Sequence, residues 1–323
     1  MLKDIPFLPE AASAMAGEVD LLYLFLIAVS AFFFLLVTAL VLYFAIRYRK
    51  REGGEAPTPV HGSLGLELLW TIIPFFLSMT MFGWGAVLYF DMFSPPADAQ
   101  NIYVVGKQWM WKIQHPEGNR EIDELHVPVG TDIRLIMTSE DVIHSFYVPA
   151  FRMKMDVVPG RYTSTWFRAT KTGKYHLFCA EYCGTKHSEM VGSVYVMDPV
   201  DYEDWLNRST TATQSMAQAG EKLFAQLGCQ TCHVEESGAR GPSLHGLYNT
   251  PVSLVGGSAV QADDGYLRQS ILDPAGQVVD GFLPIMPTYK GQVSEEDVLQ
   301  LISYIKSLSI PKAVPSHPAE ENQ

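Results

Sequence analysis

The sequence has few cysteines, four in 323 residues, and this scarcity excludes a protein built on disulfides. The cysteines form two close pairs, Cys179 with Cys183 and Cys229 with Cys232. A disulfide framework staples a small domain through cysteines that are scattered along it. Two tight thiol pairs in a long chain instead favour metal or cofactor chemistry.

Positive charge is also scarce, since 23 Lys and Arg face 35 Asp and Glu for a formal net charge of -12. We expect no nucleic-acid partner, because neutralising phosphates requires clustered cations. The 48% hydrophobic content is high for a soluble protein, whereas 18% charged residues is too many for a wholly membrane-buried chain. The composition therefore indicates membrane and soluble parts together, and the length predicts two or three domains.

Two uncharged runs near the start predict a transmembrane helical hairpin within residues 1–97. In residues 21–46, eighteen of the twenty-six positions are Leu, Ile, Val or Phe, and the run exceeds the roughly 20 residues that span a bilayer. It is too long for a signal peptide and follows an acidic stretch, so we expect it to stay attached. The second run, residues 68–90, contains Pro74, which a membrane bundle tolerates.

The charges that flank these runs predict their orientation. Arg47, Arg49, Lys50 and Arg51 lie between the runs, whereas the first twenty residues offer only Lys3. The positive-inside rule places this short basic connection in the cytoplasm. Both ends of the hairpin, and all that follows it, then face outward, so the lipid bilayer is one partner.

The rest of the chain changes pattern twice, which makes it a multi-domain membrane protein. Alternating runs such as Ile133, Leu135 and Met137 predict an all-β sandwich. Further on, Ser294 and Asp297 resemble a capping box before a periodic helix, as expected of an all-α domain. The predicted units are a sandwich at 98–198, a helix and linker at 199–217, an α domain at 218–310 and a disordered tail at 311–323.

The densest chemistry lies in twelve residues that contain Cys179, Cys183, His187 and Met190. Soft sulfur donors together with imidazole suit copper, and two cysteines four apart can bridge two ions. A disulfide beside a surface histidine explains the cysteine pair but not all four side chains together. A further ligand must come from elsewhere in the sandwich; His144 is the best candidate, and the rivals are His115, His126 and His176.

A second motif, Cys229-Gln-Thr-Cys232-His233, has the C-x-x-C-H spacing of covalent haem c attachment. A zinc site needs two more ligands nearby and a thioredoxin-like motif needs a βαβ context, and neither is present in the sequence. For the second axial ligand we favour Met286, the only methionine after His233, over His245. A lone methionine is otherwise most often core packing.

The pattern C-x-E-x-C-x-x-x-H-x-x-M at residues 179–190 resembles the binuclear copper A loop of cytochrome c oxidase subunit 2. The C-terminal domain resembles class I cytochromes c, so nearly the whole chain resembles the caa-type subunit. The resemblance implies a cupredoxin-like sandwich in which His144 and the backbone carbonyl of Glu181 complete the copper ligands. It also implies that the Glu181 side chain reaches a magnesium ion beside subunit 1.

The resemblance assigns three more residues. Trp109 corresponds to a tryptophan that passes electrons to the copper pair, although Lys107 stands where histidine is common; without the family, Trp109 reads as a half-buried strand aromatic. Glu67 corresponds to a glutamate at the mouth of a proton-uptake channel, and it fits an interfacial carboxylate equally well. The carbonyl of Pro242 is expected to accept a hydrogen bond from the proximal imidazole of His233.

The function that the resemblance implies is electron entry into a respiratory, proton-pumping oxidase of a prokaryotic cytoplasmic membrane. Electrons are expected to come from a cytochrome c or a quinol-oxidising complex and to pass through haem c and copper A to haem a of subunit 1, with subunit 3 a further partner. Three alternatives are a copper-delivery protein of the thioredoxin type, a nitrous oxide reductase and a tethered carrier that acts without subunit 1. Residues 218–310 hold ten acidic and five basic side chains, which suits a basic donor.

Overall fold

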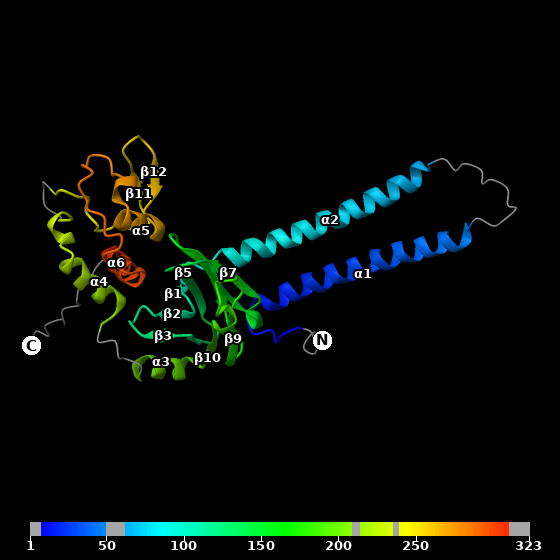
Figure 1. The fold of residues 1–323 in the computed structure, drawn as a ribbon, viewed down its shortest axis with the longest axis horizontal. Coiled ribbons are helices and arrows are strands. Elements are labelled where there is room, and N and C mark those ends of the chain that lie inside the picture. The colour runs from blue at the N-terminus through cyan, green and yellow to red at the C-terminus, as the bar shows by residue number, and fades with distance from the viewer. Residues whose placement is uncertain (1–7, 50–61, 209–213, 235–238, 310–323) are drawn as a thin grey trace, which may run out of the picture.

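The computed structural model describes residues 8–49, 62–208, 214–234 and 239–309. Two long helices project side by side from a body that contains a β-sandwich and a helical domain (Figure 1). The disordered tail predicted for 311–323 lies outside the described residues, as do Lys50 and Arg51. The predicted fold class, a helical hairpin followed by a sandwich and an α domain, is confirmed.

The projecting helices are α1, Ala16–Arg47, and α2, Leu64–Phe93. Both extend beyond the predicted spans, because the polar residues at their ends continue the helical hydrogen bonding. Apolar side chains such as Phe34, Ile46 and Phe82 are exposed along them. Both helices are long and apolar enough to cross a membrane, and an outward apolar surface suits lipid.

The sandwich consists of two five-stranded sheets. Its core is formed by large side chains such as Trp111, Phe146 and Leu177, which point inward from the strands and are fully buried between the sheets. In spatial order the first sheet contains β3 Arg120–Ile122, β2 Met110–Gln114, β1 Gln100–Lys107, β5 Asp132–Ser139 and β8 Thr163–Arg168. The second contains β4 Glu124–Pro128, β10 Val191–Met197, β9 Gly173–Cys179, β6 His144–Val148 and β7 Met153–Val157.

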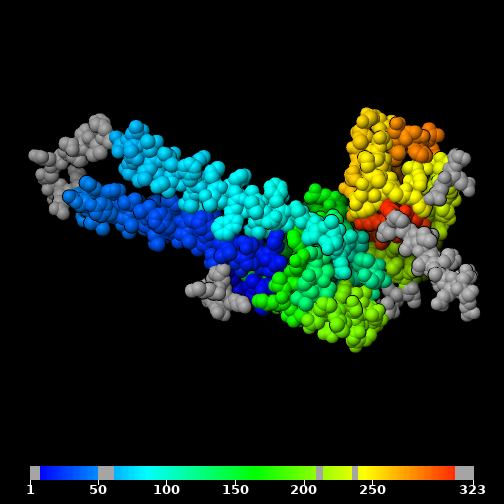
Figure 2. Space-filling view, turned by 180° about the vertical axis from the view of Figure 1, so that it is seen from behind, coloured from blue at the N-terminus to red at the C-terminus, as the bar shows by residue number. Residues whose placement is uncertain are grey.

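The hairpin is attached to the sandwich by polar contacts at both helices. Near the start of α1, the Asp20 carboxylate accepts hydrogen bonds from Arg152, at 2.7 Å from Nε. At the end of α2, the carbonyl of Asp91 accepts a hydrogen bond from Trp166 Nε1 at 3.0 Å. These contacts hold the sandwich at the end of the hairpin that lies away from the basic connection (Figure 2).

Helix α3, Pro199–Arg208, follows the sandwich and packs against its edge. The C-terminal domain contains α4 Met216–Gln226, α5 Asp264–Leu272, α6 Glu295–Ser307 and a small ladder of β11 Pro251–Ser253 with β12 Ala259–Gln261. Ser294 and Asp297 form the predicted capping box of α6. Helices α4 and α6 cross closely at Gly220, where an added Cβ would lie 2.0 Å from the carbonyl oxygen of Gln300.

Candidate functional site

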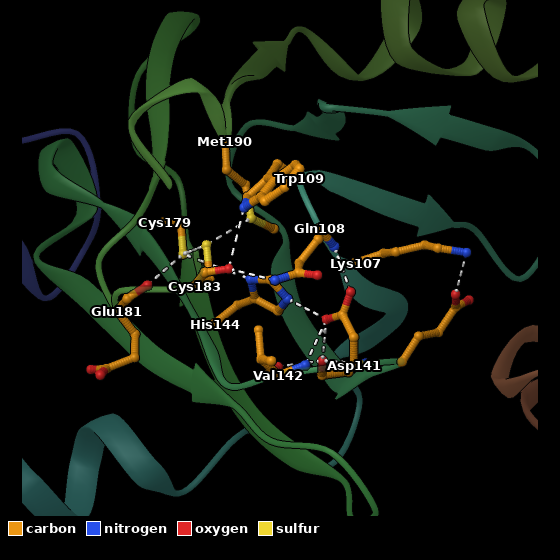
Figure 3. A network of polar contacts seen from close by, with 12 residues as sticks. Lys107, Gln108, Trp109, Asp141, Val142, His144, Cys179, Glu181, Cys183 and Met190 are labelled. Carbon is orange, nitrogen blue, oxygen red and sulfur yellow. Dashed lines mark hydrogen bonds and ion pairs between the residues drawn. The ribbon is translucent and has the colours of Figure 1, made fainter. Parts of the chain in front are cut away.

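The loop after β9 folds back so that its sulfur and imidazole side chains converge. A series of tight turns does this, in which the backbone N–H of His187 donates to Gly184 O at 3.1 Å and that of Met190 donates to His187 O at 3.2 Å. The strand then resumes as Cys179 N–H donates to Met190 O at 3.1 Å. Three sequence-predicted site residues are thereby brought together with Cys179: Cys183 and Met190, which Figure 3 shows, and His187.

The donor atoms lie close enough to share metal ions. The Cys183 Sγ atom lies 3.7 Å from Cys179 Sγ, 3.5 Å from His187 Nδ1 and 3.9 Å from Met190 Sδ. The carbonyl oxygen of Glu181 lies 3.2 Å from Cys179 Sγ. Donors bound to one ion at about 2.0–2.3 Å stand roughly 3.3–3.8 Å apart in tetrahedral geometry. The spacings here, 3.2–3.9 Å, lie close to that range, so these donors suit metal ions shared between the two thiols.

His144, at the start of β6, joins this cluster from the neighbouring strand and is fully buried. Its Nδ1 atom lies 3.9 Å from Cys179 Sγ, and its Nε2 atom donates to Asp141 Oδ1 at 2.8 Å. The Nε2 contact turns Nδ1 toward the sulfurs, so release of the Nδ1 proton gives the tautomer that a metal ligand requires. Asp141 was not predicted from the sequence, although its position three residues before His144 is a usable signal.

The surroundings of the cluster shift the pKa values of the two thiols in opposite directions. Burial raises the pKa of Cys179, but hydrogen bonds with His144 and with backbone groups outweigh it and lower that pKa to about 6. Burial and the neighbouring charge of Cys179 raise the pKa of Cys183 to about 12. The first thiolate therefore forms readily, and the second requires a cation to offset its charge, which is the behaviour expected of a metal ligand pair.

Two side chains that follow β1 hold the loop from outside. The backbone carbonyl of Cys183 accepts hydrogen bonds from Gln108 Nε2 at 2.8 Å and from Trp109 Nε1 at 3.2 Å. Gly184 has a φ of 118°, and a Cβ there would lie 3.0 Å from Gln108 Nε2 and 3.2 Å from Trp109 Cζ2. Only glycine permits this close approach, so the loop packs tightly against Gln108 and against Trp109, the residue predicted to pass electrons to the copper pair.

The three rival histidines lie outside this cluster. His115 and His126 both contact the buried carboxylate of Glu121, His115 through Nε2 at 2.7 Å and His126 through Nδ1. His176 is exposed on β9 and stacks on Phe178. Each rival therefore has a partner set of its own, and His144 is the histidine from outside the loop that meets the sulfurs.

The side chains of Glu181 and Glu67 are exposed in the described chain. Glu67 lies in the first turn of α2, where its backbone N–H donates to Ser63 O at 2.9 Å. Neither carboxylate belongs to the His, Cys, Asp and Glu clusters that the described residues form. The magnesium and proton-channel roles therefore stay predictions that concern a neighbouring subunit.

The second site is a cavity of about 340 Å³ in the C-terminal domain. Cys229, Cys232, His233 and Met286 line it together with apolar side chains of α5 and α6, whereas His245 is not among its lining residues. The Nδ1 atom of His233 donates to Pro242 O at 2.8 Å, which leaves Nε2 free to bind iron. Gly241 packs against the ring, since an added Cβ would lie 2.9 Å from His233 Cε1. The donor set and the apolar lining fit a covalently attached haem.

These features define a class: a membrane-anchored electron-transfer protein with a sulfur and imidazole metal centre in a sandwich and a separate haem-binding domain. Comparison with known families narrows the class. Residues 4–82 match the transmembrane domain of cytochrome c oxidase subunit II, and residues 120–197 match its periplasmic domain. Residues 215–305 match the cytochrome c oxidase, cbb3-type, subunit III family.

Relatives of similar sequence give the same result. Cytochrome c oxidase subunit 2 of Alkalihalophilus pseudofirmus is 30% identical over 298 residues, which cover 88% of this chain and 85% of that protein. The subunit of Thermostichus vulcanus is 33% identical over 252 residues, covering 61% and 77% of the two chains. The crystal structure of the periplasmic domain of cytochrome oxidase subunit II from Bradyrhizobium japonicum has a TM-score of 0.34 and 34% identity, covering 36% of this chain and 95% of that one.

The chain belongs to the cytochrome c oxidase subunit 2 family, with the caa-type fusion of a C-terminal cytochrome c domain. It is membrane-anchored, with a periplasmic soluble part, and it is a member of a haem-copper oxidase complex. Its role is electron transfer in that terminal oxidase, with copper A and haem c as the implied cofactors.

Proposed function

We propose that this subunit is the electron-entry point of a proton-pumping oxidase in a prokaryotic cytoplasmic membrane. It takes electrons from a cytochrome c or a quinol-oxidising complex and delivers them to haem a of subunit 1, with subunit 3 in the same complex. The observation that carries the proposal is the presence of two redox-type donor sets on one anchored chain: the thiolate and imidazole cluster and the C-x-x-C-H cavity.

For copper A we assign six ligands. His144, Cys179, Cys183, His187 and Met190 contribute side chains, and Glu181 contributes its backbone carbonyl. The contacts of 3.2–3.9 Å among these atoms support the assignment. When bound, a copper pair held by these residues would supply reversible one-electron chemistry. The chain's contribution is to hold the donors rigidly, with Met190 and His144 fully buried.

For haem c we assign Cys229 and Cys232 as the attachment thiols and His233 and Met286 as the iron ligands. Pro242 orients the His233 ring by accepting its Nδ1 proton. Thioether ligation raises the reduction potential of a haem, as a carrier on the way to oxygen needs. We propose residues 218–310 as the limits of the haem domain and residues 98–198 as the limits of the copper domain.

Trp109 is the proposed electron-entry residue of the copper centre. Its indole donates directly to the carbonyl of the ligand residue Cys183, and its ring packs against the sandwich core. For Glu181 we propose a second role, in which its exposed carboxylate faces a magnesium ion at subunit 1. For Glu67 we propose the mouth of the proton-uptake channel, which the exposed position at the start of α2 supports.

The proposal requires the hairpin to lie with its connection in the cytoplasm. Arg47 and Arg49 mark that end of the described helices, and the soluble domains then lie on the periplasmic side. The donor therefore approaches from the periplasm, where it meets the acidic haem domain.

Affinity purification of the full chain from solubilised membranes tests the proposal. We expect a large haem-bearing membrane subunit to co-purify, and this chain to retain haem on a denaturing gel because the attachment is covalent. The Cys229→Ala/Cys232→Ala variant is the control for the haem stain. Purification of the haem-stained chain alone would contradict the oxidase role and leave a tethered electron carrier.

A further inference from the structure

An apolar patch on the outer face of the first sheet is buried under the haem domain. Tyr103 and Val105 of β1 and Ile136 of β5 point away from the sandwich core, yet they are only 3%, 2% and 2% exposed. Met216 and Leu299 of the haem domain pack on them in one cluster. Side chains on a sheet face that is otherwise solvated are buried here because a second domain covers them.

Lys112 forms ion pairs with carboxylates of both domains. Lys112 of β2 lies 3.0 Å from Glu296 of α6 and 2.8 Å from Glu140 of its own sandwich. Burial acts to lower the pKa of Lys112, but the two carboxylates together outweigh it and raise that pKa above its ordinary value. The contact therefore joins a charged group of the copper domain to one of the haem domain across the interface.

Arg268 of α5 makes the second polar attachment. Its Nη1 atom donates to the carbonyl of Gly160 in the turn between β7 and β8 at 2.6 Å, and its guanidinium lies 5.8 Å from the ring centre of Tyr162. The side chain is only 9% exposed and is paired with Glu295. A buried arginine with three kinds of partner is costly to detach, because separation leaves its donors unpaired.

The turn between β2 and β3 forms hydrogen bonds with residues on both sides of the linker that joins the two domains. Asn119 Nδ2 donates to Leu206 O, near the end of α3, at 3.0 Å. The backbone N–H of Met216, the first residue of α4, donates to Pro116 O at 3.0 Å. The haem domain is therefore attached to the sandwich at the point where it begins.

Helix α6 contacts the haem cavity with one face and the sandwich with another. Leu301 and Ile305 line the haem cavity, while Leu299 packs against β1 and β5. The residue after Val105 on β1 is Gly106, where an added Cβ would lie 3.0 Å from Cδ2 of the copper-site residue His144. In Figure 2 the red helix borders the sandwich beneath the yellow and orange part of its domain. Leu283, another lining residue of the cavity, is 72% exposed and so is not covered by this contact.

We propose that the haem domain works in one docked position, with α6 on strand β1 as its contact for internal electron transfer and with Lys112, Arg268 and Leu299 as positioning residues. This inference rests on the proposed function. Each transfer moves one electron, which oxidises the haem domain and reduces the copper domain, and no bond is made or broken. The open side of the cavity stays outside the contact, so an external donor can bind without undocking the domain.

A charge placed in the interface tests this position in the intact oxidase. Leu299→Asp forces a carboxylate into the apolar patch, and we expect internal transfer, measured by flash photolysis, to fall at least about tenfold. Val255→Asp is the matched control, because Val255 is an exposed apolar residue of the same domain; its rate should equal that of the unmodified oxidase. Unchanged absorption of the haem and unchanged copper resonance in both variants verify that the two sites are still loaded.

A zero-length cross-link tests the contact independently of electron transfer. Carbodiimide joins Lys112 to Glu296 as an amide, with loss of water, only where the two groups touch, and peptide mapping identifies the product. We expect this product in the intact oxidase and in Val255→Asp but not in Leu299→Asp. The rate should fall in Lys112→Met, recover in Lys112→Arg, and be unaffected in Lys107→Met, which pairs with Glu140 alone.

Absence of the Lys112–Glu296 product from the loaded oxidase would overturn the inference, as would a Leu299→Asp variant that transfers at the original rate. Both results leave the proposed function intact, because the haem and the copper would still be present. Loss of the proposed function would instead appear as a chain that binds neither group.

Discussion

The Asp141 carboxylate accepts a hydrogen bond from His144 Nε2 at 2.8 Å and so directs the other ring nitrogen at the Cys179 sulfur. The same carboxylate accepts the backbone N–H groups of Gln108 and Val142, each at 2.7 Å. Asp141 therefore joins the loop before β6 to the segment after β1, and the copper-facing orientation of His144 depends on it.

Replacing Asp141 tests that dependence. We expect Asp141→Ala to weaken copper binding about 10- to 100-fold, the usual cost of losing a carboxylate that orients a metal-bound histidine. Competition with a copper chelator measures the affinity. Asp132→Ala, which removes a carboxylate paired with Arg168 elsewhere on the sandwich, should bind copper as the unmodified protein does; equal affinities in both variants would contradict the orienting role.

The axial ligand of the haem gives a second prediction. Met286→Leu removes the thioether but keeps the apolar volume, so we expect the reduction potential of haem c to fall by on the order of 100 mV, since axial ligands tune haem potentials over about 0.8 V. Redox titration of the haem absorption measures this shift. A potential that is unchanged in Met286→Leu and lowered in His245→Leu would assign the ligand to His245 instead.

Ionic strength gives a third prediction, about the external donor. With a basic soluble cytochrome c, we expect the second-order rate of electron entry to fall about tenfold between roughly 10 mM and 200 mM salt, because the acidic haem domain steers the approach. Stopped-flow kinetics measure the rate. A rate that does not respond to salt would place the docking site away from the acidic surface.

The buried carboxylate of Glu121 gives a fourth prediction, about stability. Burial acts to raise its pKa, but hydrogen bonds from His115 and His126 outweigh it and lower that pKa in the folded protein. A group whose pKa falls on folding stabilises the protein above its ordinary pKa, and this contribution is lost as the pH falls through the lowered value. The sandwich should therefore lose stability as the solution becomes acidic.

Glu121→Gln should remove this acid-dependent part and cost about 1–3 kcal/mol at pH 7, because the buried His115 and the half-buried His126 lose a charged partner. Urea unfolding followed by tryptophan fluorescence measures it, since Trp205 stacks on His126. Glu117→Gln changes an exposed glutamate in the turn just before β3 and is the control. Equal free energies of unfolding in the two variants would show that the Glu121 contacts contribute nothing.

The sequence predicts most of the copper and haem donor residues because they are local. Cys179, Cys183, His187 and Met190 lie within one loop whose own turns bring them together. The sequence predicts the hairpin equally well, because a continuous apolar run of this length has few alternatives to a membrane helix. In both cases the information lies within a dozen or two consecutive residues.

Contacts between distant segments are what the sequence does not reveal. His115 and His126 look like ligands in the chain, but the ring of Trp205, in the later helix α3, packs on both of them. The docking of Leu299 on Val105 joins segments almost two hundred residues apart. The apolar run from Ile102 to Val105 on β1 does not reveal what covers its outer face, since a strand pattern carries no information about a second domain.

Electron paramagnetic resonance of the oxidised, purified complex tests the central claim most directly. The account predicts the seven-line signal of a mixed-valence copper pair in the unmodified oxidase and its loss in Cys183→Ser, with haem c still attached to the chain in both. A preparation with haem c and no such signal, or a signal that survives in Cys183→Ser, would contradict the assignment of a copper pair to this loop.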